Sequence, residues 1–150
     1  MDAQHAKHLV SVYIEGWRAN DKTRILSVIA EECVVIESHG PTFLGKQEIA
    51  RWLDDWIKQG SRVTKWDVSS FTYEKSIAAA EWVFACECLG VHYEIIGASI
   101  FRFSDQVISR VTEYRSTKET EANQALEHND PSRHAGCCAP VAPAGVVAHL

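Results

Sequence analysis

The spacing of apolar residues changes once along this chain, and that change most constrains the fold. Up to about residue 60 apolar residues recur at helical intervals, and from Arg62 onward they alternate with a period of two. The first pattern is typical of amphipathic helices and the second of half-buried strands. Helices followed by a run of strands predict an α+β domain, with a sheet packed over the helices.

Three helices are predicted in the first part of the chain. The first covers residues 6–19, and a second, short helix follows a cap at Asn20 or Asp21, with Ile29 on its apolar stripe. The third is the most distinct, because Glu48 lies in its first turn and Gly60 just past its end. Its apolar stripe consists of Ile49, Trp52, Leu53, Trp56 and Ile57. The β-branched run 33–36 between the second and third helices predicts a strand.

The second part of the chain predicts three or four long antiparallel strands in a meander. Apolar residues change parity at Ser69-Ser70, which indicates a β-bulge that bends the first long strand. Further strands are expected at 77–88, 91–103 and 107–116, separated by short turns. We expect the bent sheet to close over the helices as a cone, whose interior suits a small apolar ligand.

The aromatic residues indicate where the domain ends. All five Trp, four Tyr and five Phe lie between Tyr13 and Tyr114, so we assign residues 1–117 to the folded domain. The tail, 118–150, is polar at first and contains three of the four prolines from Pro131 onward. Such a segment buries too little apolar surface to offset its ordering entropy, and we expect it to be disordered.

Charge and composition exclude several functional classes. The net charge is −5 with no basic run, which argues against nucleic-acid binding. No apolar stretch approaches the ~20 residues of a membrane span, and the N-terminus lacks signal-peptide features. Five irregularly spaced cysteines indicate no disulfide framework. We therefore expect a cytoplasmic protein.

No metal or cofactor site is predicted. Cys137-Cys138 could bind a soft metal, but the usual pattern needs a second pair, which the chain lacks. The chain also has no P-loop, no dinucleotide-binding glycine pattern and no Gly-x-Ser-x-Gly motif.

Four motifs carry a resemblance to a known family. They are residues 13–21 (YIEGWRAND), 29–37 (IAEECVVIE), 44–49 (LGKQEI), and 97–103 (GASIFRF) with 111–114 (VTEY). With them the chain resembles SnoaL-like and ketosteroid-isomerase-like proteins of the nuclear transport factor 2-like superfamily. The resemblance implies a cystatin-like, cone-shaped antiparallel sheet wrapped over three N-terminal helices. It leaves the function open, because this superfamily hosts enzymes, binding proteins and transport factors.

The resemblance also implies roles for single residues. Glu37 falls where ketosteroid isomerases have the proton-shuttling carboxylate, and Tyr13 where they have the tyrosine that hydrogen-bonds the substrate carbonyl. Their assisting neutral acid would fall at or near Ser99, where this chain has a serine. Glu113 matches a last-strand acid of limonene-type epoxide hydrolases. The paired Arg and Asp of those hydrolases would fall near Trp82 and Phe84, which argues against epoxide hydrolysis.

These residues could perform acid–base chemistry next to a carbonyl. Burial among apolar residues makes Glu37 a stronger base, Tyr13 could stabilise an enolate oxygen, and His39 or Glu113 could assist. Substrate contacts are predicted for Trp17, Trp52, Trp56, Trp66, Trp82, Phe84, Ser99 and Phe101. Other interpretations stay open at this point. Glu37 and His39 could be a solvated pair, Tyr13 could only fill space, and Glu113 could pair with a neighbouring arginine.

We therefore predict a protein that binds a small apolar or polycyclic molecule. The preferred function is a cofactor-free isomerase or cyclase, and the alternative is a non-catalytic binding or dimeric interaction module of the same fold. A homodimer through the outer face of the sheet is expected, because Ile96, Ala98 and Ile100 make the second face of their strand apolar too.

Overall fold

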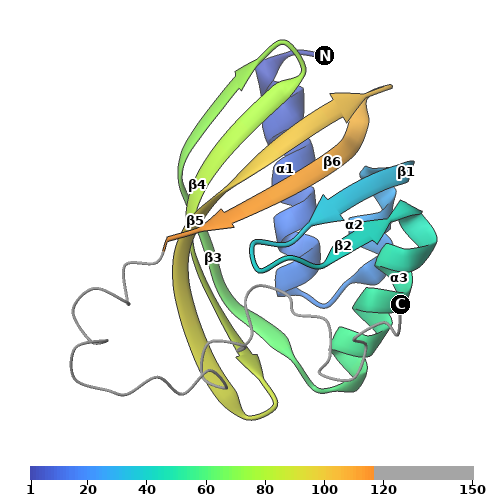
Figure 1. Cartoon of the computed structure of the whole chain (residues 1–150). Helices are drawn as coiled ribbons and strands as arrows, with labels where there is room; N and C mark the ends of the chain where they lie inside the picture. Colours follow the sequence, from blue (N-terminus) through green and yellow to red (C-terminus); the bar gives the residue numbers. More distant parts are fainter. Residues whose placement is uncertain (117–150) are drawn as a thin grey trace.

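Three helices and two short strands precede the long strands of the sheet. The computed structural model describes residues 1–116, in the order α1 (Ala3–Arg18), α2 (Lys22–Ser27), β1 (Ile29–Ile36), β2 (Thr42–Leu44), α3 (Gly45–Lys58), β3 (Arg62–Glu74), β4 (Ile77–Cys88), β5 (Val91–Ser104) and β6 (Val107–Arg115) (Figure 1). The predicted tail and Cys137-Cys138 lie outside the described residues. The change to strand begins at Arg62, as the sequence predicts.

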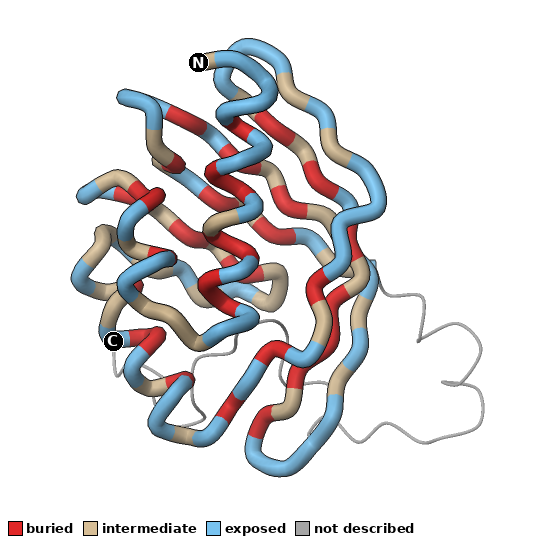
Figure 2. The backbone as a smooth tube through the Cα atoms, turned by 180° about the vertical axis from the view of Figure 1, so that it is seen from behind, coloured by how far each residue is buried: buried red, intermediate tan, exposed pale blue. Residues whose placement is uncertain are grey.

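All six strands form one curved sheet in the order β2-β1-β6-β5-β4-β3. β3 to β6 are an antiparallel meander, and β1 joins it by pairing parallel with β6. The helices lie on the concave side, where α1 crosses the sheet and α3 packs beside β1 (Figure 1). This arrangement is the predicted α+β plan, and buried residues recur along the length of α1 (Figure 2).

The helix ends follow local capping chemistry. Asp21 caps α2, because its carboxylate accepts the backbone N–H of Arg24 at 3.0 Å. Gly60, with φ at 74°, follows the end of α3. Two details of the predicted helices are wrong. Ile29 begins β1 instead of continuing the stripe of α2, and Ile57 is 37% exposed because it lies at the edge of the buried face of α3.

Register shifts bend the long strands. One lies between Val68 and Ser70 of β3, at the predicted bulge, and another lies between Val63 and Lys65. A third separates Arg102 from Phe103 in the pairing of β5 with β6. The inner face of β4 is buried throughout, as its alternation predicts, at Ala78, Ala80, Trp82, Phe84, Cys86 and Cys88. No helix among residues 1–116 is both long and apolar enough to cross a membrane.

Candidate active site

Two carboxyl groups are buried on the concave side of the sheet. Glu37 and Glu113 are each only 3% exposed. In the parallel pairing of β1 with β6, Ile36 lies opposite Thr112, so Glu113 is the next residue of β6 and Glu37 is the first residue after β1. A turn closed by the hydrogen bond from the Glu37 N–H to the Pro41 carbonyl, 2.9 Å, fixes the backbone just after β1. The interpretation of Glu37 as a solvated residue is therefore wrong.

Tyr13 of α1 is buried within electrostatic reach of both glutamates. It is 1% exposed, and its ring meets those of Trp17, Trp66 and Phe101 edge-on at centroid distances of 6.1–6.4 Å. Burial raises the pKa of the Tyr13 hydroxyl well above 10.0, and the negative charges of Glu113 and Glu37 raise it further, against an opposing effect of Trp17. The hydroxyl therefore keeps its proton and lies within electrostatic reach of both carboxyl groups.

Glu113 ends a hydrogen-bonded chain that crosses three strands. The Trp82 indole N–H donates to Ser99 Oγ at 2.9 Å, and the Ser99 hydroxyl donates to Glu113 Oε1 at 3.4 Å. Burial raises the pKa of Glu113 from 4.5 to about 8, with the Ser99 bond acting in the opposite direction. The carboxyl group is therefore mostly neutral at pH 7. Its hydrogen-bond partner is Ser99, whereas of the two arginines considered as alternatives Arg110 is exposed and Arg115 is half-buried.

The direction of this chain assigns the proton of Glu113. An indole N–H can only donate, so Trp82 occupies an acceptor site of Ser99 and leaves the serine proton for Glu113 Oε1. Because Oε1 accepts, the carboxylic acid proton belongs on Oε2. That oxygen is buried and has no hydrogen-bond partner among residues 1–116. Oε2 is thus a donor available to a bound molecule.

His39 lies beside Glu37 and is held neutral. Its Nδ1 is 4.0 Å from Glu37 Oε2, which is beyond hydrogen-bonding distance. Burial lowers the pKa of His39 from 6.5, and the positive charge of Arg115 lowers it further. Both ring nitrogens are buried without a hydrogen-bond partner among the described residues. A neutral imidazole offers one donor and one acceptor at this position.

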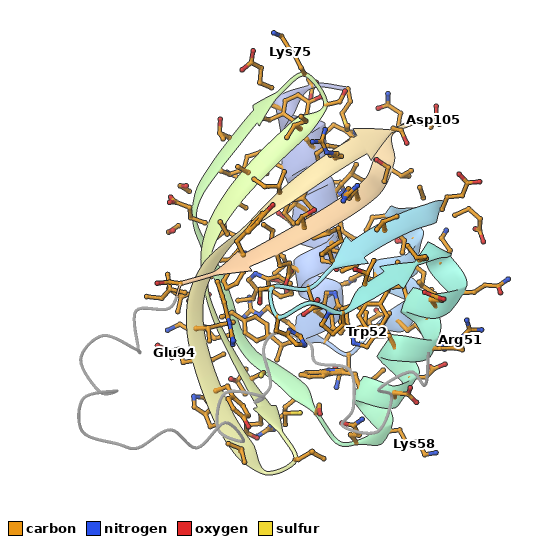
Figure 3. The ribbon with its side chains drawn as sticks, viewed as in Figure 1. Arg51, Trp52, Lys58, Lys75, Glu94 and Asp105 are labelled. Atoms are coloured by element: carbon orange, nitrogen blue, oxygen red, sulfur yellow. The ribbon has the colours of Figure 1, made fainter. Side chains whose placement is uncertain are left out.

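The predicted aromatic residues gather around these polar groups. Trp17, Trp52, Trp56, Trp66, Trp82, Phe84 and Phe101 are all at most 2% exposed, as is Ser99. Trp52 points from α3 toward the sheet, while Arg51 and Lys58 point away from it (Figure 3). Trp56 has a structural contact, because its indole N–H donates to Asn20 Oδ1 at 3.1 Å.

Sequence reasoning missed two residues of this region. Phe43 of the short strand β2 stacks on Trp52, with ring centroids 4.1 Å apart and planes 11° from parallel. Cys33 of β1 is buried as a free thiol whose pKa burial raises to about 12, and it lies within electrostatic reach of Tyr13. An aromatic residue just before a helix carries no distinctive signal. Cys33 was visible only as part of an apolar strand.

Cysteine pairing differs from the sequence-based expectation at one position. Cys88 at the end of β4 is disulfide-bonded, and Cys33 is a buried free thiol. Among residues 1–116 no cluster of three or more His, Cys, Asp or Glu side chains could hold a metal ion.

Comparison with known proteins identifies the family of this domain. The sequence profile of the SnoaL-like domain matches residues 10–111. The chain belongs to the SnoaL-like domain family. No curated protein matches the chain. The matched range runs from the middle of α1 to the middle of β6, and it includes Tyr13, Glu37 and Ser99 but ends before Glu113.

Solved structures share the fold of this SnoaL-like domain. A candidate polyketide cyclase from Xanthomonas campestris has a TM-score of 0.63 at 24% identity, over 77% of this chain and 93% of that one. An LEH-like epoxide hydrolase from M. tuberculosis has a TM-score of 0.69 at 11% identity, over 77% and 85%. A Catenulispora acidiphila protein with a ketosteroid isomerase-like fold, in complex with trimethylamine, scores 0.63 at 16% identity, over 79% and 93%. These likenesses confirm the predicted nuclear transport factor 2-like fold.

Proposed function

We propose that the domain binds a small, mainly apolar carbonyl compound on the concave side of its sheet and catalyses cofactor-free acid–base chemistry next to the carbonyl. One observation carries the proposal. The buried Tyr13 hydroxyl lies within electrostatic reach of two buried carboxyl groups, and one of these, Glu113, has its pKa raised to about 8. A neutral acid beside a protonated tyrosine suits a developing oxyanion, while a second carboxylate can act as a base.

In this mechanism Glu37 removes a proton from the carbon next to the substrate carbonyl. The electron pair of the broken C–H bond moves onto the carbonyl oxygen and forms an enolate. Tyr13 and Glu113 Oε2–H donate hydrogen bonds to that oxygen, and their contribution is larger to the enolate than to the neutral ketone. His39, 4.0 Å from Glu37, would orient the carboxylate or relay its proton.

The proton held by Glu37 can then take one of two paths. Returned to a different carbon of the enolate, it gives an isomerised ketone. If the enolate carbon instead attacks a second carbonyl of the same molecule, a C–C bond forms and Glu37 protonates the new alkoxide, which gives a ring. Neither path consumes an oxidant, a reductant or a cofactor.

Exchange of α-protons tests the base without knowledge of the natural substrate. The probe is 2-tetralone in D2O, whose loss of α-proton signal is followed by NMR with and without protein. We expect wild-type protein to accelerate exchange, and Glu37→Gln to reduce the acceleration by roughly 100-fold or more. Glu94→Gln is the matched control, because Glu94 is exposed on β5 and points outward (Figure 3). Equal exchange rates for Glu37→Gln and wild type would refute the role of Glu37.

The variant Tyr13→Phe tests the role of the oxyanion donor independently of the role of the base Glu37. Loss of one such donor typically lowers turnover by about 10²–10³-fold. Phenylalanine keeps the edge-on ring contacts, so binding of the ketone should change much less than its exchange rate. A variant that loses affinity and rate equally would argue that Tyr13 only fills space.

The second candidate is a dimeric binding or interaction module. On the outer face of the sheet Ile96 is 50% exposed and Tyr114 is 58% exposed, and Ala98 pairs directly with Tyr114. We propose that this face joins two copies of the chain in a cytoplasmic homodimer. Sedimentation equilibrium should give twice the chain mass for wild type and the chain mass for Ile96→Glu. A monomeric wild-type protein would contradict the dimer and leave the acid–base proposal intact.

A further inference from the structure

The five tryptophans of the core differ in what their indole N–H groups bind. Trp56 donates to Asn20 and Trp82 donates to Ser99, at 3.1 and 2.9 Å. The N–H groups of Trp17, Trp52 and Trp66 are buried and have no acceptor within hydrogen-bond distance among residues 1–116. That of Trp17 acts on the pKa of the Tyr13 hydroxyl, so it belongs to the surroundings of the proposed oxyanion donor. The chain thus supplies acceptors for two of its buried indoles and leaves three without, of which Trp52 and Trp66 are not linked to Tyr13 in this way.

An unused buried indole N–H is informative because it has one function only. It donates a hydrogen bond and cannot accept one, and a buried donor without an acceptor costs free energy. Trp52 and Trp66 are each 2% exposed. Phenylalanine would bury a ring at these positions without that cost, so the N–H groups themselves require an explanation.

Both indoles belong to the cluster of rings that surrounds Tyr13. The Trp66 ring of β3 meets the Tyr13 ring edge-on at 6.3 Å. Trp52 of α3 is one ring further away, because the Trp17 ring lies between it and Tyr13. The Trp17 ring centroid is 4.8 Å from that of Trp52 and 6.4 Å from that of Tyr13. Two donors from separate elements therefore lie near the proposed oxyanion site, and neither belongs to the acid–base set.

We propose that the indole N–H groups of Trp52 and Trp66 recognise oxygen atoms of the bound molecule other than the reacting carbonyl. The ligand is then a ring compound that carries several acceptor oxygens, as carbonyl or ether groups, and a hydrocarbon skeleton with a single carbonyl is disfavoured. This inference rests on the proposed function, because it takes the reacting carbonyl to lie against Tyr13 and Glu113. It sharpens the expected apolar ligand into an apolar ring system with acceptors at its periphery.

The test uses pairs of naphthols that differ in one acceptor. In each pair the phenolic hydroxyl is the same, and the distal substituent is either methoxy, which only accepts, or ethyl, which has similar size and no acceptor. Both 6- and 7-substituted 2-naphthols are used, because Trp52 and Trp66 lie in different directions from Tyr13 and a substituent that reaches one indole need not reach the other. Affinities are measured by calorimetry on wild type, Trp52→Phe, Trp66→Phe and the control Trp56→Phe.

We expect at least one methoxy compound to bind wild type roughly tenfold more tightly than its ethyl partner, as for one added hydrogen bond. That preference should disappear in Trp52→Phe or Trp66→Phe and persist in Trp56→Phe, whose N–H already has Asn20 as acceptor. In ¹⁵N-edited NMR spectra the methoxy compound should shift an indole N–H signal assigned to Trp52 or Trp66. The signal of Trp56 should stay in place.

The outcomes separate the two proposals. If the naphthols bind but every methoxy and ethyl pair has equal affinity, the acceptor-recognition inference is wrong and the proposed function survives. If no naphthol binds at all, both fail. A methoxy preference that all three tryptophan variants retain would also overturn the inference.

Discussion

Replacing Glu113 by glutamine keeps the size of the side chain and removes its titrating proton. In the folded domain burial raises the pKa of Glu113 from 4.5 to about 8. Between these values the folded state holds a proton that the unfolded chain has released, so the free energy of unfolding falls as the pH rises. The contribution is complete below pH 4.5 and is lost as the pH passes through about 8. At about 1.4 kcal/mol per pH unit, this interval corresponds to at most about 5 kcal/mol.

Urea unfolding followed by tryptophan fluorescence, in steps between about pH 5 and pH 9, measures this effect. The quantity to compare is the free energy of unfolding of wild type minus that of Glu113→Gln. We expect this difference to decrease by several kcal/mol from pH 5 to pH 8 and then to level off. His39 titrates in both proteins, so its contribution cancels. A control variant, Glu94→Gln, should follow wild type, and a difference independent of pH would refute the assignment of a neutral Glu113.

Three further outcomes follow from the same region. His39→Gln should make the free energy of unfolding depend less on pH below about pH 7. Burial lowers the pKa of His39 from 6.5, so as the pH falls the unfolded wild-type chain binds a proton at His39 that the folded chain does not, and the folded state loses stability. Urea unfolding of both proteins at about pH 5 and pH 7 measures this difference. Gly97→Ala should lower the free energy of unfolding by about 1–3 kcal/mol, since a Cβ there would collide with the Trp82 ring and the Tyr114 carbonyl, and a thermal melt would show it. Affinity for 2-naphthol should decrease above about pH 8 in wild type as Glu113 ionises, and calorimetry should find a flatter profile in Glu113→Gln.

Local patterns predicted most of the fold. The change of period at Arg62 and the parity change at Ser69-Ser70 are properties of single strands, and both appear in the structure where the sequence places them. The strand β2 was not predicted, because three residues at a sheet edge are too few to show a period. The parallel pairing of β1 with β6 was also missed. It joins residues 76 to 79 positions apart, and no local pattern carries that information.

The orientation of Glu113 shows where single-strand reasoning stops. Ile108 and Val111 do not share a parity, yet both are fully buried together with Glu113. The register shift explains this, because Arg102 pairs with Arg110 and Phe103 with Ile108, which leaves Ser109 as an extra residue. A bulge of this kind is defined by the partner strand. The sequence of β6 alone therefore left both orientations of Glu113 open.

Pairing between neighbouring strands also changes how the serine at position 99 is interpreted. By position along the chain, serine replaces the neutral acid that the family resemblance implies there. In the sheet, however, Ser99 lies directly opposite Glu113, and its hydroxyl donates to that carboxyl group. Two residues paired across neighbouring strands reach the same point on the concave face, so a carboxyl group on either strand can serve it. A carboxyl group with a raised pKa therefore stands opposite Ser99 on β6, although the residue on β5 is itself a serine.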